Sequence, residues 1–197
     1  RRPAPRFTIG CATGGNGVRH GASLDDERTR QLQAIVAALP RPGTPQFRND
    51  DLDRFRACFG DSETFGGPAY GFPDVIAATE QAVRLTEANR DLVREALPWL
   101  YDEFADWYPC FVVVADEKAV SACYSSRIGD RASEAGVDTL PGYRGRGYAA
   151  IATAAWGAAV RASGRIPIYS TGWSNLASQG VARKLSLRQF GSDATWE

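Results

Sequence analysis

The sequence predicts an α+β fold: a mixed, mostly antiparallel twisted sheet flanked by helices, with a helical extension at the N-terminus. Two observations lead to this prediction. Residues 111–115 and 119–126 are rich in strand-forming residues and are joined by Asp116-Glu117-Lys118, the pattern of a β-hairpin. Later, a strand pattern at 135–140, a helix pattern at 147–163 and a strand pattern at 166–170 follow one another, as in a strand–helix–strand crossover.

Residues 1–79 are predicted to be an accessory segment, separate from a core at 80–197. The first 22 residues contain the run G-G-N-G without strand or helix periodicity around it, so we interpret them as a mobile lead-in. Ser23 with Asp26 is expected to cap a helix that Pro40 ends. The patterns that follow are a helix at 50–59 with Gly60 after it, and an edge strand or loop at 66–73 because of its prolines.

The core begins with a short alternating strand at 83–85, after which Thr86 is placed to cap a helix. Pro98 interrupts or restarts that helix, and an apolar face continues to Pro109. After the hairpin, the crossover and a helix pattern from Ser174 to Leu187, a short terminal strand completes the sheet.

Composition excludes several classes of protein. The 197 residues carry 23 basic and 23 acidic side chains, and a neutral chain binds nucleic acids and membrane surfaces poorly. The sequence has no apolar run long enough for a membrane span and no apolar signal region at its start. Four scattered cysteines without a C-x-x-C pair favour reduced thiols in a cytoplasmic protein, and a single histidine, His20, argues against a metal site.

The run from Gly142 to Gly147, G-Y-R-G-R-G, has the properties of an anion-binding loop. Its glycines allow backbone N–H groups to point at phosphate oxygens, and the helix that follows adds its free N–H groups and positive dipole end. Arg144 and Arg146 bring forked donors suited to a pyrophosphate. The spacing G-x-x-G-x-G is the reverse of the dinucleotide fingerprint, and no G-K-[ST] follows, so neither a Rossmann site nor a P-loop fits.

Two motifs in the core carry a family resemblance. R-x-x-G-x-A, read at Arg144, Gly147 and Ala149, resembles the acetyl-CoA pyrophosphate loop of the GNAT superfamily of N-acetyltransferases. Downstream, N-L-A-S-Q-G-V-A-R-K-L-S-L resembles the second GNAT signature, with the family's Gly-Phe replaced by Ser186-Leu187. The matching positions are Asn175, Ser178, Val181, Lys184 and Leu185, and within the superfamily the chain is most similar to FR47-like predicted acetyltransferases.

The resemblance implies an enzyme that transfers an acetyl group from acetyl-CoA, as co-substrate, to a primary amine by direct attack. It also implies that the strand carrying 137–140 splays from the strand at 166–170, which frees backbone N–H groups for the pantetheine arm and the thioester oxygen. Asn175 either caps the next helix or bonds the pantetheine chain. The cofactor-binding residues so implied are Val137, Thr139, Arg144, Gly145, Arg146, Gly147, Tyr148, Ala149, Asn175 and Ser178.

Glu134, at the start of the strand that leads to the loop, matches the position where several GNAT enzymes place a general base. The alternatives are that Glu134 is a solvated strand-end carboxylate, or that Asp138 is the base. Many GNAT enzymes have a tyrosine that protonates the leaving thiolate where this chain has Ala182. Tyr169 or Tyr143 is then the substitute, and Tyr169 is our candidate.

The acceptor is not specified by the sequence beyond a small-molecule or peptide amine. An aromatic group lies in the helix that the family uses to wall the acceptor pocket, but the same helical spacing is typical of a core. Its members are Trp99, Tyr101, Phe104, Trp107 and Tyr108. A non-catalytic acyl-CoA-binding sensor or regulatory module is the alternative function, because Ala182 is what lost catalysis would leave, and a homodimer is an open alternative for assembly.

Overall fold

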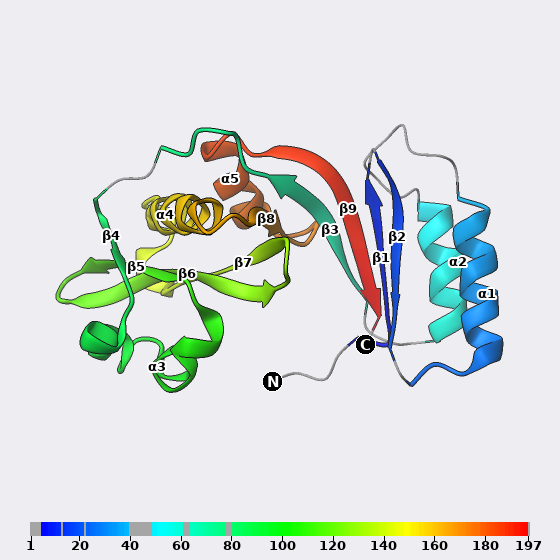
Figure 1. Ribbon diagram of the computed structural model, residues 1–197, viewed down its shortest axis with the longest axis horizontal. Coiled ribbons are helices and arrows are strands. Elements are labelled where there is room, and N and C mark those ends of the chain that lie inside the picture. Colours follow the sequence, from blue (N-terminus) through cyan, green and yellow to red (C-terminus); the bar gives the residue numbers. More distant parts are fainter. Residues whose placement is uncertain are drawn as a thin grey trace. The chain divides into compact units, whose positions relative to one another are not determined.

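The computed structural model describes residues 5–12, 14–21, 23–39, 49–60, 64–77 and 80–196 (Figure 1). Along the chain, with η for a 3-10 helix, the elements are β1 (Phe7–Ala12), β2 (Gly15–His20), α1 (Asp26–Ala37), α2 (Asn49–Phe59), β3 (Thr64–Gly71), β4 (Ala82–Arg84), η1 (Glu87–Val93), α3 (Pro98–Glu103), η2 (Phe104–Trp107), β5 (Cys110–Ala115), β6 (Lys118–Ile128), β7 (Ala132–Thr139), η3 (Pro141–Tyr143), α4 (Tyr148–Ala162), β8 (Ile166–Ser170), α5 (Leu176–Lys184) and β9 (Arg188–Trp196). In this part of the chain, no helix is both long enough and apolar enough to cross a membrane.

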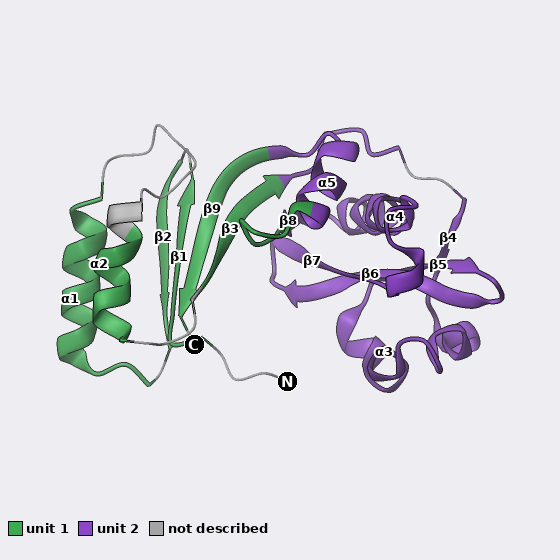
Figure 2. Cartoon of the chain, turned by 180° about the vertical axis from the view of Figure 1, so that it is seen from behind, with its two compact units in different colours: residues 1–70, 170–176, 189–197 green, residues 71–169, 177–188 purple. Residues whose placement is uncertain are grey.

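The chain forms two compact units, which Figure 2 colours separately. Unit 1 comprises residues 1–70, 170–176 and 189–197, and unit 2 comprises residues 71–169 and 177–188. Each unit is therefore assembled from separate segments of the sequence. The functional division into 1–79 and 80–197 stays a prediction.

Unit 1 contains the strands β2, β1, β9 and β3, in that spatial order. In β1 alternate residues are buried, and Phe7 lies opposite His20 of β2 on one side and Trp196 of β9 on the other. The mobile lead-in predicted at 1–22 is therefore wrong for the described residues, while residues 1–4, 13 and 22 lie outside them. The signal that was missed is the period-2 alternation of F-T-I-G-C-A, which fits a half-buried strand.

The two helices of unit 1 cover the buried face of β1. Asp25 caps α1, because its Oδ1 accepts the Arg28 N–H at 2.7 Å, so the cap expected at Ser23 is wrong by two positions. Pro40, the predicted end of this helix, lies outside the described residues. The second helix ends at Gly60 in the left-handed region, φ 64°, as the sequence predicted. The buried core residues shared by helices and strands are Phe7, Ile9, Leu32, Phe55, Phe59, Ala194 and Trp196.

The segment predicted as an edge strand or loop is β3, and the edge prediction is wrong. One side of β3 neighbours β9. On the other side, the C=O groups of Gly66 and Pro68 accept the N–H groups of Trp173 and Thr171, each at 3.2 Å. Pro68 is tolerated in this strand because the hydrogen bond with Thr171 uses the carbonyl oxygen of Pro68 and needs no N–H group from it. Gly67 is required by the close approach, since a Cβ there would lie 1.6 Å from the Thr171 carbonyl oxygen.

Unit 2 contains β8, β7, β6, β5 and β4 in that spatial order. Pairing is antiparallel from β4 to β7 and parallel between β7 and β8. The helix α4 packs across β5, β6 and β7 (Figure 1). The β5–β6 turn is made by Asp116 and Glu117, both with positive φ, as in the predicted hairpin. The predicted fold class, a mixed and mostly antiparallel sheet with flanking helices, is confirmed.

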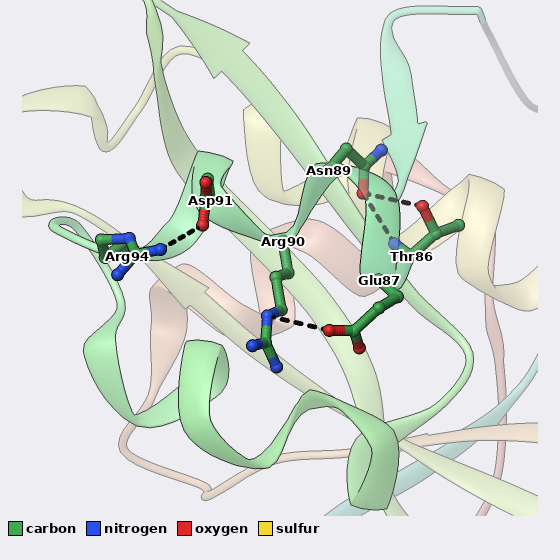
Figure 3. Close-up of polar contacts among 6 residues, drawn as sticks. All are labelled: Thr86, Glu87, Asn89, Arg90, Asp91 and Arg94. Atoms are coloured by element: carbon green, nitrogen blue, oxygen red, sulfur yellow. Dashed lines mark hydrogen bonds and ion pairs between the residues drawn. The ribbon is translucent and has the colours of Figure 1, made fainter.

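The short helices η1, α3 and η2 also belong to unit 2 and pack against its core. The segment starting at Thr86 is a 3-10 helix, where the Thr86 N–H donates to Asn89 Oδ1 at 2.7 Å (Figure 3). Two exposed ion pairs follow along it, Arg90 with Glu87 and Arg94 with Asp91 (Figure 3). Exposed pairs of this kind contribute little to stability because solvent and salt screen the two charges. The fully buried residues beneath them include Leu85, Val93, Leu100, Cys110, Val112, Ala119 and Ala122.

All four cysteines are free thiols, as expected from their spacing. Burial raises the pKa of the Cys110 thiol from 9.0 to about 12. Burial also raises the pKa of Cys123, on the neighbouring strand β6. Both thiols therefore stay protonated near neutral pH and are structural residues of the core.

Candidate functional site

The parallel ladder between β7 and β8 is short, and this opens an edge in the sheet. Its paired residues are Ala132 with Ile166, Ser133 with Pro167, and Glu134 with Ile168. The pairing of β7 with β6, in contrast, continues to Thr139. Among the described residues, β7 beyond Glu134 thus has no partner in β8. The splay expected between these strands is present.

The alternation of backbone groups along β7 determines which N–H groups face this open edge. The Leu140 N–H donates to the Val120 carbonyl at 2.9 Å, so residue 140 points toward β6. Neighbouring residues of a strand point their backbone groups to opposite sides. Thr139 and Val137 therefore direct their N–H and C=O groups toward the open edge, as a ligand lying alongside β7 would require.

The glycine-rich loop continues from this edge into α4. Arg144 Nε donates to the Thr139 carbonyl oxygen at 3.2 Å, which ties the loop to the open edge. Gly145 and Gly147 have φ angles of 76° and 88°, a region that glycine enters without strain. Because α4 begins at Tyr148, directly after Gly147, the first free N–H groups of the helix, including that of Ala149, open onto the loop.

The ring of Tyr143 contacts the other arginine of the loop and a lysine of the β5–β6 hairpin. Arg146 lies over its ring, 5.2 Å from the centroid, and Lys118 from the β5–β6 hairpin lies 5.5 Å away. The Tyr143 hydroxyl donates to Asp116 Oδ2 at 2.7 Å, and this hydrogen bond raises the pKa of Tyr143. The cationic groups of Arg146 and Lys118 therefore lie close to the loop, while the Tyr143 hydroxyl is hydrogen-bonded to Asp116 of the hairpin.

Glu134 is the third residue of β7 and not, as predicted, its beginning, because the strand starts at Ala132. Its Oε2 accepts from Arg127 Nη1 at 2.9 Å, and its side chain is 19% exposed. A β-bulge at Ser126 in β6 brings Arg127 opposite Glu134, and the Ser126 hydroxyl donates to the Glu134 carbonyl oxygen at 3.1 Å. Bulges of this kind re-aim side chains next to functional sites. The carboxylate is thereby half-sheltered and held in place by its neighbour.

Asp138 is the alternative base, and the sequence did not determine on which face of the strand it lies. In the structure it lies on the same face of β7 as Glu134. Between them is Gly136, and the ring of Tyr124 lies above it: a Cβ at Gly136 would be 2.3 Å from Tyr124 Cε2. The Tyr124 hydroxyl donates to Asp138 Oδ2 at 2.8 Å. Burial, followed by the nearby Asp138 charge, raises the pKa of Tyr124 well above its ordinary range. This tyrosine was not predicted, although a glycine in the middle of a strand marks a close approach.

The aromatic residues of α3 and η2 hold Tyr124 in position. Trp99 and Trp107 meet its ring edge to face, at centroid distances of 5.0 and 5.5 Å, and meet each other at 5.8 Å. Tyr101 and Phe104 pack against the same core, and Tyr108 is exposed. The core interpretation of this aromatic group is thus the one that the contacts support.

The remaining predicted residues lie at β8 and around the start of α5. Tyr169 is buried, and its hydroxyl lies 2.7 Å from Ser178 Oγ of α5, so the structure brings these two residues together. Ala182, two turns from the start of that helix, is also buried. Asn175 belongs to unit 1, where its N–H donates to the Gly172 carbonyl at 3.0 Å.

The sequence was also compared with known families. The model of the family described as GNAT acetyltransferase matches residues 77–191, more than half of the chain. The chain belongs to the GNAT acetyltransferase family. This confirms the superfamily predicted from the two motifs, while the FR47-like subtype stays a prediction. No curated protein matches the sequence.

Solved structures share the fold of this GNAT chain. A putative GNAT acetyltransferase from Novosphingobium aromaticivorans is 21% identical, with a TM-score of 0.56 over 68% of this chain and 64% of its own. A GCN5-related N-acetyltransferase-like protein from Streptococcus suis is 17% identical, with a TM-score of 0.53 over 98% and 85%. A GNAT acetyltransferase from Colwellia psychrerythraea is 13% identical, with a TM-score of 0.55 over 92% and 76%. The chain thus spans less than two thirds of the first of these proteins, and at such identities the likeness concerns the fold.

Proposed function

We propose that this protein is an N-acetyltransferase that transfers the acetyl group of acetyl-CoA to the primary amine of a small-molecule or peptide acceptor. The observation that carries the proposal is the open edge of β7, which leads directly into the glycine-rich loop at the start of α4. Family membership supports acetyl transfer in general. The four free cysteines favour a reducing compartment, and we infer the cytoplasm.

The residues of this region fit the chemistry of acetyl-CoA. Gly145 and Gly147 leave their amides open to phosphate oxygens, and Arg144 and Arg146 supply charge for a pyrophosphate. The N–H groups of Tyr148 and Ala149 point out of the first turn of α4. Acetyl-CoA supplies the activated acyl group as a thioester, and Asn175 and Ser178 are assigned to its pantetheine arm by the family pattern.

The open edge of β7 accounts for oxyanion stabilisation. Attack of an amine on a thioester carbonyl develops negative charge on the carbonyl oxygen. The N–H groups of Val137 and Thr139 face the edge where that oxygen would lie, and they are fixed by the β6–β7 ladder. Because these donors are already oriented, they need no reorganisation during the reaction.

Glu134 is our general base. An amine attacks only in its neutral form, so the proton of the acceptor ammonium has to be removed, directly or through a water. The Glu134 carboxylate is partly exposed and is held by Arg127, whereas Asp138 on the same face accepts the hydroxyl of Tyr124. We therefore assign the proton transfer to Glu134 and a positioning role to Asp138.

Tyr169 is our candidate for protonating the leaving thiolate. Tyr143 is less suited because its hydroxyl is donated to Asp116. The Tyr169 hydroxyl shares a short hydrogen bond with Ser178, on the helix α5 that carries the second motif. A thiol of pKa about 8.5 also leaves reasonably well as the thiolate near neutral pH, so this step needs little acid catalysis.

The second candidate function is a non-catalytic acyl-CoA-binding sensor. The observation that favours it is Ala182, which is buried in α5 at the position of the family's tyrosine. Thiol release from acetyl-CoA across a panel of amines, together with calorimetry of acetyl-CoA binding, separates the two. Turnover with any amine supports the enzyme, binding without turnover supports the sensor, and the absence of binding contradicts both.

A further inference from the structure

The side chain of Lys184 reaches the glycine-rich loop from a distant part of the sequence. Lys184 is the last residue of α5. A Cβ atom built on Gly147 would lie 2.5 Å from its Nζ, so the ammonium group occupies the space beside the glycine that precedes α4. The absence of a side chain at Gly147 therefore makes room for this ammonium group.

This position is electrostatically unfavourable for a cation alone. The N-terminus of a helix carries a partial positive charge, and the 15 residues of α4 are long enough to develop it. Arg144 and Arg146 add two further charges in the same loop. Within the described residues, Lys184 has no carboxylate as an ion-pair partner. The like charges become favourable together only when an anion lies among them.

We propose that Lys184 binds the pyrophosphate of acetyl-CoA, as a third cation beside Arg144 and Arg146. The inference rests on the proposed function and extends it, because α5 then contributes to cofactor binding through charge. The pyrophosphate is the chosen group because Nζ lies at Gly147, where the loop amides and the start of α4 meet. A lysine ammonium is a compact point charge with three donors, and it complements the two forked arginines.

The consequence is a preference for the type of acyl donor. A thioester carried on pantetheine alone lacks the pyrophosphate and gains nothing from Lys184. A donor that retains the pyrophosphate but lacks the ribose 3′-phosphate, such as acetyl-dephospho-CoA, keeps the whole binding free energy that Lys184 contributes. Lys184 is thus a specificity residue for the nucleotide part of the donor.

Calorimetry on the full chain tests this. Lys184→Ala should weaken acetyl-CoA binding about tenfold, equivalent to about 1.4 kcal/mol, and Lys184→Arg should restore most of it. Arg183→Ala is the matched control, since Arg183 is the neighbouring exposed cation of the same helix, and its Nη2 lies 3.7 Å from a Cβ built on Gly180 of α5. The acetyl-CoA dissociation constant of Arg183→Ala should lie within about twofold of that of the parent protein. Thermal unfolding checks that all variants remain folded.

Three donors locate the contact. Lys184→Ala should weaken acetyl-dephospho-CoA as much as acetyl-CoA, while the rate with acetyl-pantetheine should not change. A loss confined to intact acetyl-CoA would mean that Lys184 binds the 3′-phosphate, and it would overturn the proposal. Normal acetyl-CoA binding by Lys184→Ala would also overturn it. Failure of the parent protein itself to bind acetyl-CoA would instead contradict the proposed function, on which this inference depends.

Discussion

Replacing Gly147 with valine should abolish acetyl-CoA binding while leaving most molecules folded. A residue with a Cβ pays about 1–2 kcal/mol in the left-handed region, and Gly147 has a φ of 88°. For a chain of 197 residues this lowers Tm by about 2–8 °C. The new Cβ would also lie 2.5 Å from Lys184 Nζ and would displace that ammonium group. Loss of two charge-assisted hydrogen bonds at about 1.5 kcal/mol each weakens binding about 100-fold or more.

Gly164→Val is the matched control for this experiment. Gly164 has nearly the same φ, 82°, lies at the end of α4, and would place its Cβ in open space. The valine there should cost similar stability and leave acetyl-CoA affinity unchanged. The two quantities are measured by thermal unfolding and calorimetry. If both variants lose the same affinity, or if Gly147→Val binds normally, the loop does not bind the pyrophosphate in the way argued above.

Three further perturbations probe other parts of the molecule. Glu134→Gln should lower kcat/KM about 100-fold at neutral pH, with a deficit that shrinks as rising pH deprotonates the amine, and an unchanged pH profile would place the base elsewhere. The raised pKa of Cys110 stabilises the fold below pH 9.0, and this contribution should be lost between pH 9.0 and about 12, by about 1.4 kcal/mol per unit. Denaturant unfolding at pH 9 and 10.5 measures it, and Cys110→Ala should lack that part of the slope. Phe55 is fully buried, with ring centroids 5.6 Å from Phe7 and 5.4 Å from Trp196, so Phe55→Ala should cost about 3–5 kcal/mol. The acetyl-CoA affinity of the folded fraction should stay the same. A weaker affinity of the folded protein would contradict an accessory role for residues 1–79.

Elements stabilised by local contacts were predicted well from the sequence. The hairpin around Asp116, the helix α4 and the strand β8 lie within a few residues of the predicted bounds, because turn residues and periodicity specify them. Of the strands of unit 1, β1 and β2 were missed, and β1 has one of its partners, β9, at the far end of the sequence. β2 reads G-N-G-V-R-H, a sequence with low strand propensity, and it is a strand through its pairing with β1.

In the candidate site, too, residues that are adjacent in sequence were recognised and residues that meet only in the fold were not. The glycine-rich loop could be proposed as a phosphate site from the sequence because its glycines and arginines are adjacent there, and this role stays a prediction. The neighbours of the loop were not predicted. Lys184 was recognised as part of a motif without a role, and Tyr124 was not considered, since its approach to Gly136 depends on the register of β6 and β7. Side chains that meet through tertiary structure leave little trace in local patterns.

The pairing of β1 with β9 has a consequence for how the chain matures during synthesis. Phe7 and Ile9 leave the ribosome early, but their cross-strand neighbours Trp196 and Ala194 are translated after all of unit 2. Until then the early strand presents an apolar face and an unpaired edge, which are the features that promote aggregation of nascent chains. Domains usually fold in the order in which they are made, yet unit 1 begins first and can be completed only last. The edge of β1 that pairs with β9 therefore stays unpaired until unit 2 has been synthesised.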